Sequence, residues 1–195
     1  MKPTVTKEAL KDLSSDNPRV KYKRVKNLLT IAGKNPEQLY PHLPFFVKLL
    51  KSENNILRWM AIDIIGSLSR VDTAKRIDGL LTTLFRFLRA GKMITANHTI
   101  TALAAIASAK PYYQKKVTRE LLKVEQYTYD TDECHNIALG KVIVAINSYF
   151  KELKQNDQVV EFVSRQINNS RPATRKKAEN FLNIYKNKPT KENKQ

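Results

Sequence analysis

The sequence predicts an all-α protein of one domain that is built from repeated pairs of helices. Its clearest helix covers residues 55–69, whose apolar residues fall on one stripe of a 3.6-residue helix: Leu57, Ala61, Ile64, Ile65 and Leu68. Similar stripes return along the chain at intervals of about 37 to 40 residues. With 42% hydrophobic residues and 5 glycines in 195 residues, the composition also favours ordered helices.

Two small residues in the 55–69 segment indicate that another helix packs closely against it. Ala61 and Gly66 are small where a neighbour must approach. An isolated glycine inside a helix costs about 1 kcal/mol relative to alanine, so packing has to offset it. We therefore expect this helix to be stacked between others.

The repetition extends over nearly the whole chain. Residues in four other segments match the 55–69 stripe in register: Val20, Leu28 and Ile31; Thr99, Ala102, Leu103 and Ile106; Leu139, Val142, Ile143 and Ile146; Arg175, Ala178, Phe181, Leu182 and Tyr185. Two further segments match each other at a constant offset: Leu39, Leu43, Phe46, Leu49 and Leu50 with Ile77, Leu81, Leu84, Phe87 and Leu88. This equal offset is the strongest internal evidence for repeats.

The elements before the central helix follow from caps and prolines. Residues 5–13 predict a short first helix, and Asn17 or Asp16 caps the next one, residues 19–32, with Pro18 in its first turn. The apolar side of this second helix is expected to include Val20. Residues 36–51 predict the following helix, and we expect Pro44 to bend it because proline removes a backbone donor.

The elements after the central helix repeat this order. We expect the first and second helices of successive pairs over residues 73–89, 93–109, 111–127, 136–153, 157–167 and 173–185. Residues 188–195 carry several lysines and no apolar side chain, which predicts a disordered basic tail. The repeat domain is therefore expected to cover residues 1–187.

The period and the central helix together resemble the HEAT/armadillo class of repeats. The run L-R-W-M-A-I-D-I-I-G-S-L is similar to the second helix of a HEAT repeat, through these residues: Leu57, Arg58, Ala61, Ile65, Gly66 and Leu68, repeated in part by Arg175, Ala178 and Leu182. This resemblance implies a right-handed α-solenoid, or α-α superhelix, of about five HEAT-like helix pairs. It also implies that the second helix of each pair lines a concave surface.

The charge of the chain points to anionic partners. There are 35 lysine and arginine residues against 18 acidic residues, a formal net charge of +17. Such a balance attracts polyanions, although a generally lysine-rich surface explains it equally well. The single cysteine, Cys134, excludes an internal disulfide framework. No apolar run approaches the ~18 residues of a membrane span, so we expect a cytoplasmic protein with no membrane partner.

The sequence contains no recognisable catalytic motif. We find no nucleophile–base–acid arrangement and no phosphate-binding glycine loop, and we expect no enzymatic activity and no cofactor. Asp130, Asp132, Glu133, Cys134 and His135 form one cluster of ligand-type side chains. They suit either a metal site or the start of a helix, where carboxylates cap free N–H groups, and we expect no metal.

Candidate binding residues appear when the outward positions of the second helices are aligned. They form three rows: a first row of Tyr22, Trp59, Asn97, Ile137 and Lys176; a second of Lys26, Asp63, Thr101, Lys141 and Asn180; and a third of Lys23, Met60, His98, Ala138 and Lys177. From these rows we select the partner-binding candidates: Tyr22, Lys23, Lys26, Trp59, Asp63, His98, Lys141, Lys176 and Lys177. An outward tryptophan is a candidate anchor.

Three functions compete for these residues. The first is a scaffold that holds an acidic segment of another protein on the basic concave surface, and we expect this one. The second is binding of a nucleic-acid backbone, with lysines on phosphates and Tyr22 or Trp59 stacking on a base. The third follows from a further resemblance, since Trp59-x-x-x-Asp63 is similar to the aromatic–aspartate pair of HEAT-like alkylpurine DNA glycosylases. The other aromatic and arginine positions of that family have no clear counterparts here.

Overall fold

The computed structural model describes residues 10–153 and 157–186, and these are helical, with no β-strand among them. The long helices are α2 (Pro18–Lys34), α4 (Asn55–Leu68), α6 (Met93–Ala109), α8 (Asp132–Asn147) and α10 (Pro172–Lys186). The short helices are α3 (Leu43–Leu49), α5 (Leu81–Leu88), α7 (Gln114–Leu122) and α9 (Asp157–Arg165). The prediction of an all-α protein is confirmed. The predicted tail, residues 188–195, and the expected start of the first helix lie outside the described residues.

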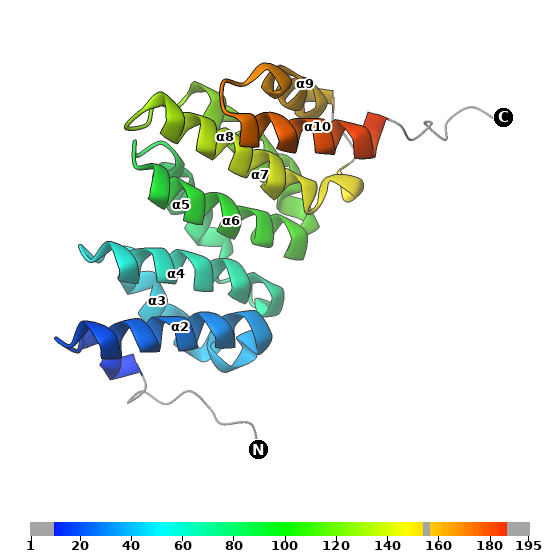
Figure 1. The fold of residues 1–195 in the computed structure, drawn as a ribbon. Coiled ribbons are helices and arrows are strands. Elements are labelled where there is room, and N and C mark those ends of the chain that lie inside the picture. The colour runs from blue at the N-terminus through cyan, green and yellow to red at the C-terminus, as the bar shows by residue number, and fades with distance from the viewer. Residues whose placement is uncertain (1–9, 154–156, 187–195) are drawn as a thin grey trace.

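The helices lie in two layers. The long helices follow one another side by side from α2 to α10, each packed against the next (Figure 1). The short helices form the other layer, where α3, α5, α7 and α9 pack against α4, α6, α8 and α10 in turn. Polar links between neighbouring long helices join residues at nearly constant separation, as in the Trp59 Nε1 to Thr95 Oγ1 bond and the Thr174 Oγ1 to Asn136 O bond, which span 36 and 38 positions.

The apolar stripe of α4 is buried largely as its spacing predicts. Ala61, Ile64, Ile65 and Leu68 are fully buried, whereas Leu57 in the first turn is half-buried. Buried apolar residues of the long and short helices together form one continuous core that runs the length of the two layers.

Two glycines mark the closest approaches between long helices. A Cβ on Gly66 would lie 2.6 Å from the Cα of Ala102 in α6, closer than real Cβ contacts allow. A Cβ on Gly140 would lie 2.6 Å from Thr174 Oγ1 in α10. The close contact predicted at Gly66 is therefore confirmed, and α8 and α10 repeat it.

The short helices are shorter than the sequence predicts. Instead of one bent helix over 36–51, two 3₁₀ turns, Pro36–Gln38 and Tyr40–His42, precede α3. Pro41 and Pro44 each lack a backbone donor, so a continuous α-helix cannot form across them, and Pro44 lies in the first turn of α3. Residues 73–77 are also non-helical, since the Asp72 carboxylate binds the N–H groups of Arg76 and Ile77.

Two burial predictions are wrong. Val20 is 40% exposed and lies in the first turn of α2, the first long helix of the described layer. Met60 and Ala138 of the third row are 2% and 0% exposed, not outward. That row faces the preceding long helix: His98 lies against Asp63 of α4. Lys23 of the same row is exposed, because α2 is the first long helix of the described layer.

A buried ionic cluster ties the two layers together at the far end of α6. Lys110 Nζ lies 2.8 Å from Asp72 Oδ2 and 2.7 Å from Asp78 Oδ1. The hydroxyl of Tyr40 donates to the other oxygen of Asp72 at 2.5 Å. Burial alone would raise the pKa of Asp72, but these hydrogen bonds outweigh it and hold that pKa below its ordinary value. Burial alone would likewise lower the pKa of Lys110, and its two carboxylate partners raise it instead.

No helix in the described ranges combines the length and the apolar content that a bilayer crossing requires.

Candidate partner-binding surface

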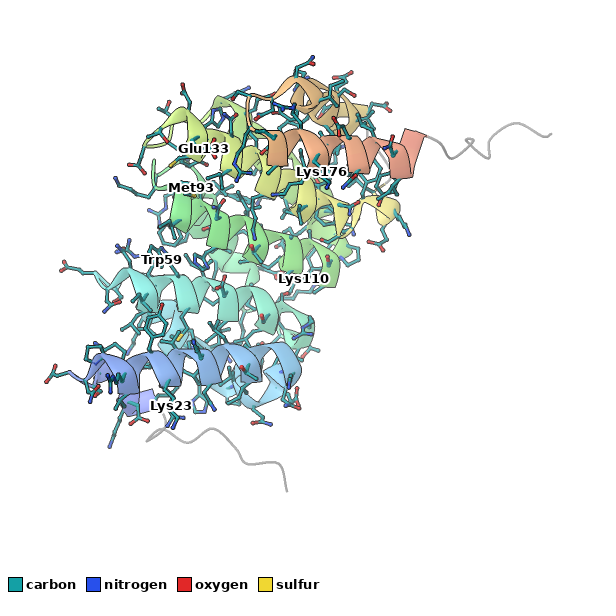
Figure 2. All side chains as sticks on the ribbon, in the orientation of Figure 1. Lys23, Trp59, Met93, Lys110, Glu133 and Lys176 are labelled. Atoms are coloured by element: carbon teal, nitrogen blue, oxygen red, sulfur yellow. The ribbon has the colours of Figure 1, made fainter. Side chains whose placement is uncertain are left out.

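The candidate residues lie on the side of the long helices that faces away from the short ones. We call this side, from α2 to α10, the outer face (Figure 2). Trp59 lies near the start of α4, and Lys23 and Lys176 mark the two ends of the layer (Figure 2). The candidates divide into three groups along it: one on α2, one between α4 and α6, and one on α8 and α10.

The first group is a basic stripe on α2. The helix begins at a capped turn, where Asn17 Oδ1 accepts from the N–H of Arg19 at 2.9 Å. From there Tyr22, Lys23 and Lys26 recur at helical spacing and are all exposed, while the opposite side of α2 is buried. The Lys26 ammonium lies 6.0 Å from the centre of the Tyr22 ring, and Tyr22 is 52% exposed. α2 thus presents an aromatic ring among cations.

The second group is a set of side chains held together between α4 and α6. The Trp59 indole lies parallel to the His98 imidazole, with ring centres 5.5 Å apart, and its Nε1–H donates to Thr95 Oγ1. On the other side, His98 Nδ1 lies 2.8 Å from Asp63 Oδ2. Trp59 is half-buried, so part of its surface packs between the helices and the remainder reaches the outer face.

Asp63 is therefore engaged by His98. Two arginines near Asp63 in the sequence bind backbone carbonyl oxygens instead: Arg58 binds that of Ser52, and Arg70 binds that of Ala32 in α2. A glycosylase-like role would need the carboxylate of Asp63 free to face a substrate. Here it holds the imidazole against the indole.

The third group is a lysine cluster on α8 and α10. Lys177 lies across Gly140 of α8, with its Nζ 3.3 Å from where a glycine Cβ would stand. Burial, followed by the neighbouring charges of Arg171 and Lys141, lowers the pKa of Lys177. Lys176, one position before it on α10, is exposed.

The ligand-type cluster at residues 130–135 forms the start of α8. Thr131 Oγ1 accepts from the N–H of Cys134, and Asp132 and Glu133 stand in the first turn, as at many helix starts. His135 Nε2 instead lies 3.1 Å from the carbonyl oxygen of Val124. Across residues 10–153 and 157–186, no group of three His, Cys, Asp or Glu side chains is placed to hold a metal ion.

Sequence reasoning missed two residues of the outer face. Arg19 continues the exposed stripe of α2 one turn before Tyr22 and Lys23, so helical periodicity was a sufficient signal for it. Arg171 precedes α10 and acts on Lys177 six positions later, a spacing with no local pattern, and only the folded chain brings the two charges close.

Comparison with solved structures supports the fold. The chain matches a crystal structure of an engineered protein, target OR329 of the Northeast Structural Genomics Consortium, with a TM-score of 0.55 and 20% sequence identity. The match covers 90% of this chain and 76% of the engineered protein. At this identity the likeness concerns the arrangement of helices alone. No protein family matches the chain, and a search of curated proteins found no similar sequence.

Proposed function

We propose that this protein is a right-handed HEAT-like α-solenoid of about five helical pairs that acts as a non-enzymatic scaffold. In this proposal the outer face, the side of the long helices that faces away from the short ones, forms the concave surface of the solenoid. An acidic segment of another protein binds along it. The regular side-by-side order of α2, α4, α6, α8 and α10 supports the solenoid. The paired state of Asp63 supports a role without catalysis. A single cysteine supports a cytoplasmic location.

The observation that carries this proposal is a set of unpaired cations at both ends of the outer face. Within the described ranges, no carboxylate forms a salt bridge with any of these six residues: Arg19, Lys23 and Lys26 on α2, and Lys141, Lys176 and Lys177 on α8 and α10. Lys110, by contrast, is buried with two carboxylates. Cations that the fold itself does not neutralise remain available to an anionic partner.

The distance between the two basic ends suggests the length of the partner. Packed helices lie about 8–10 Å apart, so α2 and α8 are separated by three steps, or about 27 Å. An extended chain covers about 3.3 Å per residue, so a segment of about 8 to 11 residues reaches from α2 to α8 or α10. The half-buried Trp59 lies between the two ends, where it offers an apolar contact to the middle of the segment.

Single-stranded nucleic acid is the second candidate, and the exposed Tyr22 favours it. This ring stands beside Lys26 with more than half of its surface open, an arrangement in which a base stacks on the ring while lysines contact phosphates. Trp59 offers less to a base, because His98 already occupies one face of the indole.

Fluorescence anisotropy with a labelled peptide of about 10 residues rich in Asp and Glu tests the scaffold function. We expect binding that weakens as salt rises, and we expect Lys23→Met/Lys26→Met to weaken it about tenfold. The matched control is Lys48→Met/Lys115→Met, which removes the same charge from exposed positions on α3 and α7. An equal loss in both variants, or no binding at low salt, would rule out a dedicated site. Tighter binding of a dT oligonucleotide of similar length would favour the second candidate.

A further inference from the structure

The lysine cluster between α8 and α10 differs from the basic stripe on α2, because its charges converge on one place. Lys177 does not extend into solvent but packs down on α8 over Gly140, where the missing side chain leaves room for its ammonium group. Lys141 is the next residue of α8, and Arg171 stands just before α10. Burial lowers the pKa of Lys177, and the charges of Arg171 and Lys141 lower it further.

The cluster is only partly neutralised. Arg171 Nε donates to Glu133 Oε1 at 2.6 Å, and Lys141 and Lys177 form no salt bridge within the described ranges. Three cations against one carboxylate leave a net charge of +2. Lys177 is also half-buried, so water screens this repulsion less than it does at the exposed lysines of α2. An arrangement of this kind is stabilised by an anion that two or more of these cations share.

We propose that Lys141, Lys177 and Arg171 form a subsite for a phosphate monoester on the partner segment, such as a phosphoserine. This proposal rests on the scaffold function and specifies it further, since the acidic segment would be recognised in its phosphorylated form. Lys141 and Lys177 donate from their ammonium groups to the phosphoryl oxygens. Arg171 joins them through its Nη groups, which donate no hydrogen bond within the described residues, while its Nε stays on Glu133.

The charge of the cluster favours a monoester over the other anions. A phosphate monoester carries about −1.5 to −2 at neutral pH, which matches a net charge of +2 at one place. A side-chain carboxylate or a backbone phosphodiester brings one negative charge and leaves the cluster half neutralised. The exposed Lys176, one position before Lys177 on α10, is available to acidic residues beside the phosphorylated one.

The test uses three labelled probes of about 10 residues on the full chain: an acidic peptide with one phosphoserine near its end, the same peptide with serine, and a dT oligonucleotide. We expect the phosphorylated peptide to bind about tenfold more tightly than its unphosphorylated twin. Lys141→Met/Lys177→Met should abolish this ratio. Lys48→Met/Lys115→Met, which removes the same charge elsewhere, should preserve it. Circular dichroism verifies that each variant is folded, and Arg171→Gln provides a milder second variant that should reduce the ratio.

The outcomes separate this inference from the scaffold function. If both peptides bind equally and Lys141→Met/Lys177→Met keeps them equal, the phosphate subsite is wrong and the scaffold function stands. A second outcome has two parts: Lys141→Met/Lys177→Met weakens binding of the phosphorylated peptide, and Lys23→Met/Lys26→Met leaves the affinity of the unphosphorylated peptide unchanged. The phosphate subsite is then supported, and the extended acidic site is wrong. If the oligonucleotide shows the larger loss in Lys141→Met/Lys177→Met, the cluster recognises phosphodiesters and the monoester proposal is overturned.

Discussion

The indole of Trp59 lies parallel to the imidazole of His98, with 9° between the ring planes and 5.5 Å between their centres. The two rings belong to α4 and α6, so the stack links two neighbouring long helices. The Trp59 Nε1–H bond to Thr95 and the His98 contact with Asp63 fix both rings from either side. The side chain that the sequence marks as a binding anchor is thus also a structural link.

This stack should contribute measurably to stability. Aromatic pairs contribute about 0.5–1.5 kcal/mol beyond the area they bury, so we expect a coupling of that size between Trp59→Ala and His98→Ala. A double-mutant cycle in urea measures it. Thr30→Ala with His98→Ala is the control, because Thr30 lies exposed on α2 and binds within its own helix. Additive effects of Trp59→Ala and His98→Ala would show that the rings do not support each other.

Replacing Gly66 by alanine should destabilise the protein although alanine is the better helix former. The new Cβ would stand 2.6 Å from the Cα of Ala102, and backbone cannot move aside as a flexible side chain does. We expect a loss of about 1–3 kcal/mol in the free energy of unfolding. Gly33→Ala is the matched control, since a Cβ there meets nothing within 4 Å, and it should gain about 0.5 kcal/mol. A gain at both positions would contradict the close packing of α4 and α6.

Removing the charge of Lys110 should have a large effect. Lys110→Met leaves Asp72 and Asp78 without their cation, and Asp72 is fully buried, so we expect a loss of about 3–5 kcal/mol. Lys92→Met removes an ion pair with Asp130 whose side chains are 71% and 49% exposed, and it should cost less than about 1 kcal/mol. Chemical denaturation of the two variants decides the comparison. Similar losses in the two variants would mean that the buried cluster contributes no more to the free energy of unfolding than an exposed ion pair does.

The same cluster should make stability depend on acid. The folded pKa of Asp72 lies below its ordinary value of 3.8, so its contribution is present above that pH and is lost as the pH falls through the lowered pKa. We expect the free energy of unfolding to decrease more steeply with acid in the wild type than in Asp72→Asn. Urea titrations at a series of pH values below 5 measure the two slopes. Parallel curves would show that Asp72 keeps an ordinary pKa after folding.

The sequence predicted the helical layers better than the contacts between them. Periodicity identifies the buried side of α4, and the small size of Gly66 indicates a close neighbour, because both are properties of one local segment. Whether Met60 is exposed or buried depends on how a neighbouring helix packs against α4, and the aligned rows alone placed it wrongly. The pairing of Lys110 with Asp72 joins residues 38 positions apart with no local pattern, and it could not be predicted.

For the partner-binding candidates, too, the sequence predicted local patterns better than contacts between helices. Helical spacing correctly gathers Tyr22, Lys23 and Lys26 on one exposed side of α2. It says nothing of the contact between His98 and Asp63, or of Arg171 beside Lys177, because these arise where two helices meet. Local patterns therefore identify exposed stripes, whereas convergent clusters require the fold.

The order of the long helices also bears on how the molecule opens. α6 packs between two long neighbours, while α2 and α10 stand at the ends of the described layer with one each. Amide protons in the middle should therefore exchange with solvent most slowly, and fraying should begin from either end. A partner that binds α2 and α10 at once would stabilise both ends of the layer against fraying. Its binding would then slow amide exchange in all the long helices, and not only in the helices that it contacts.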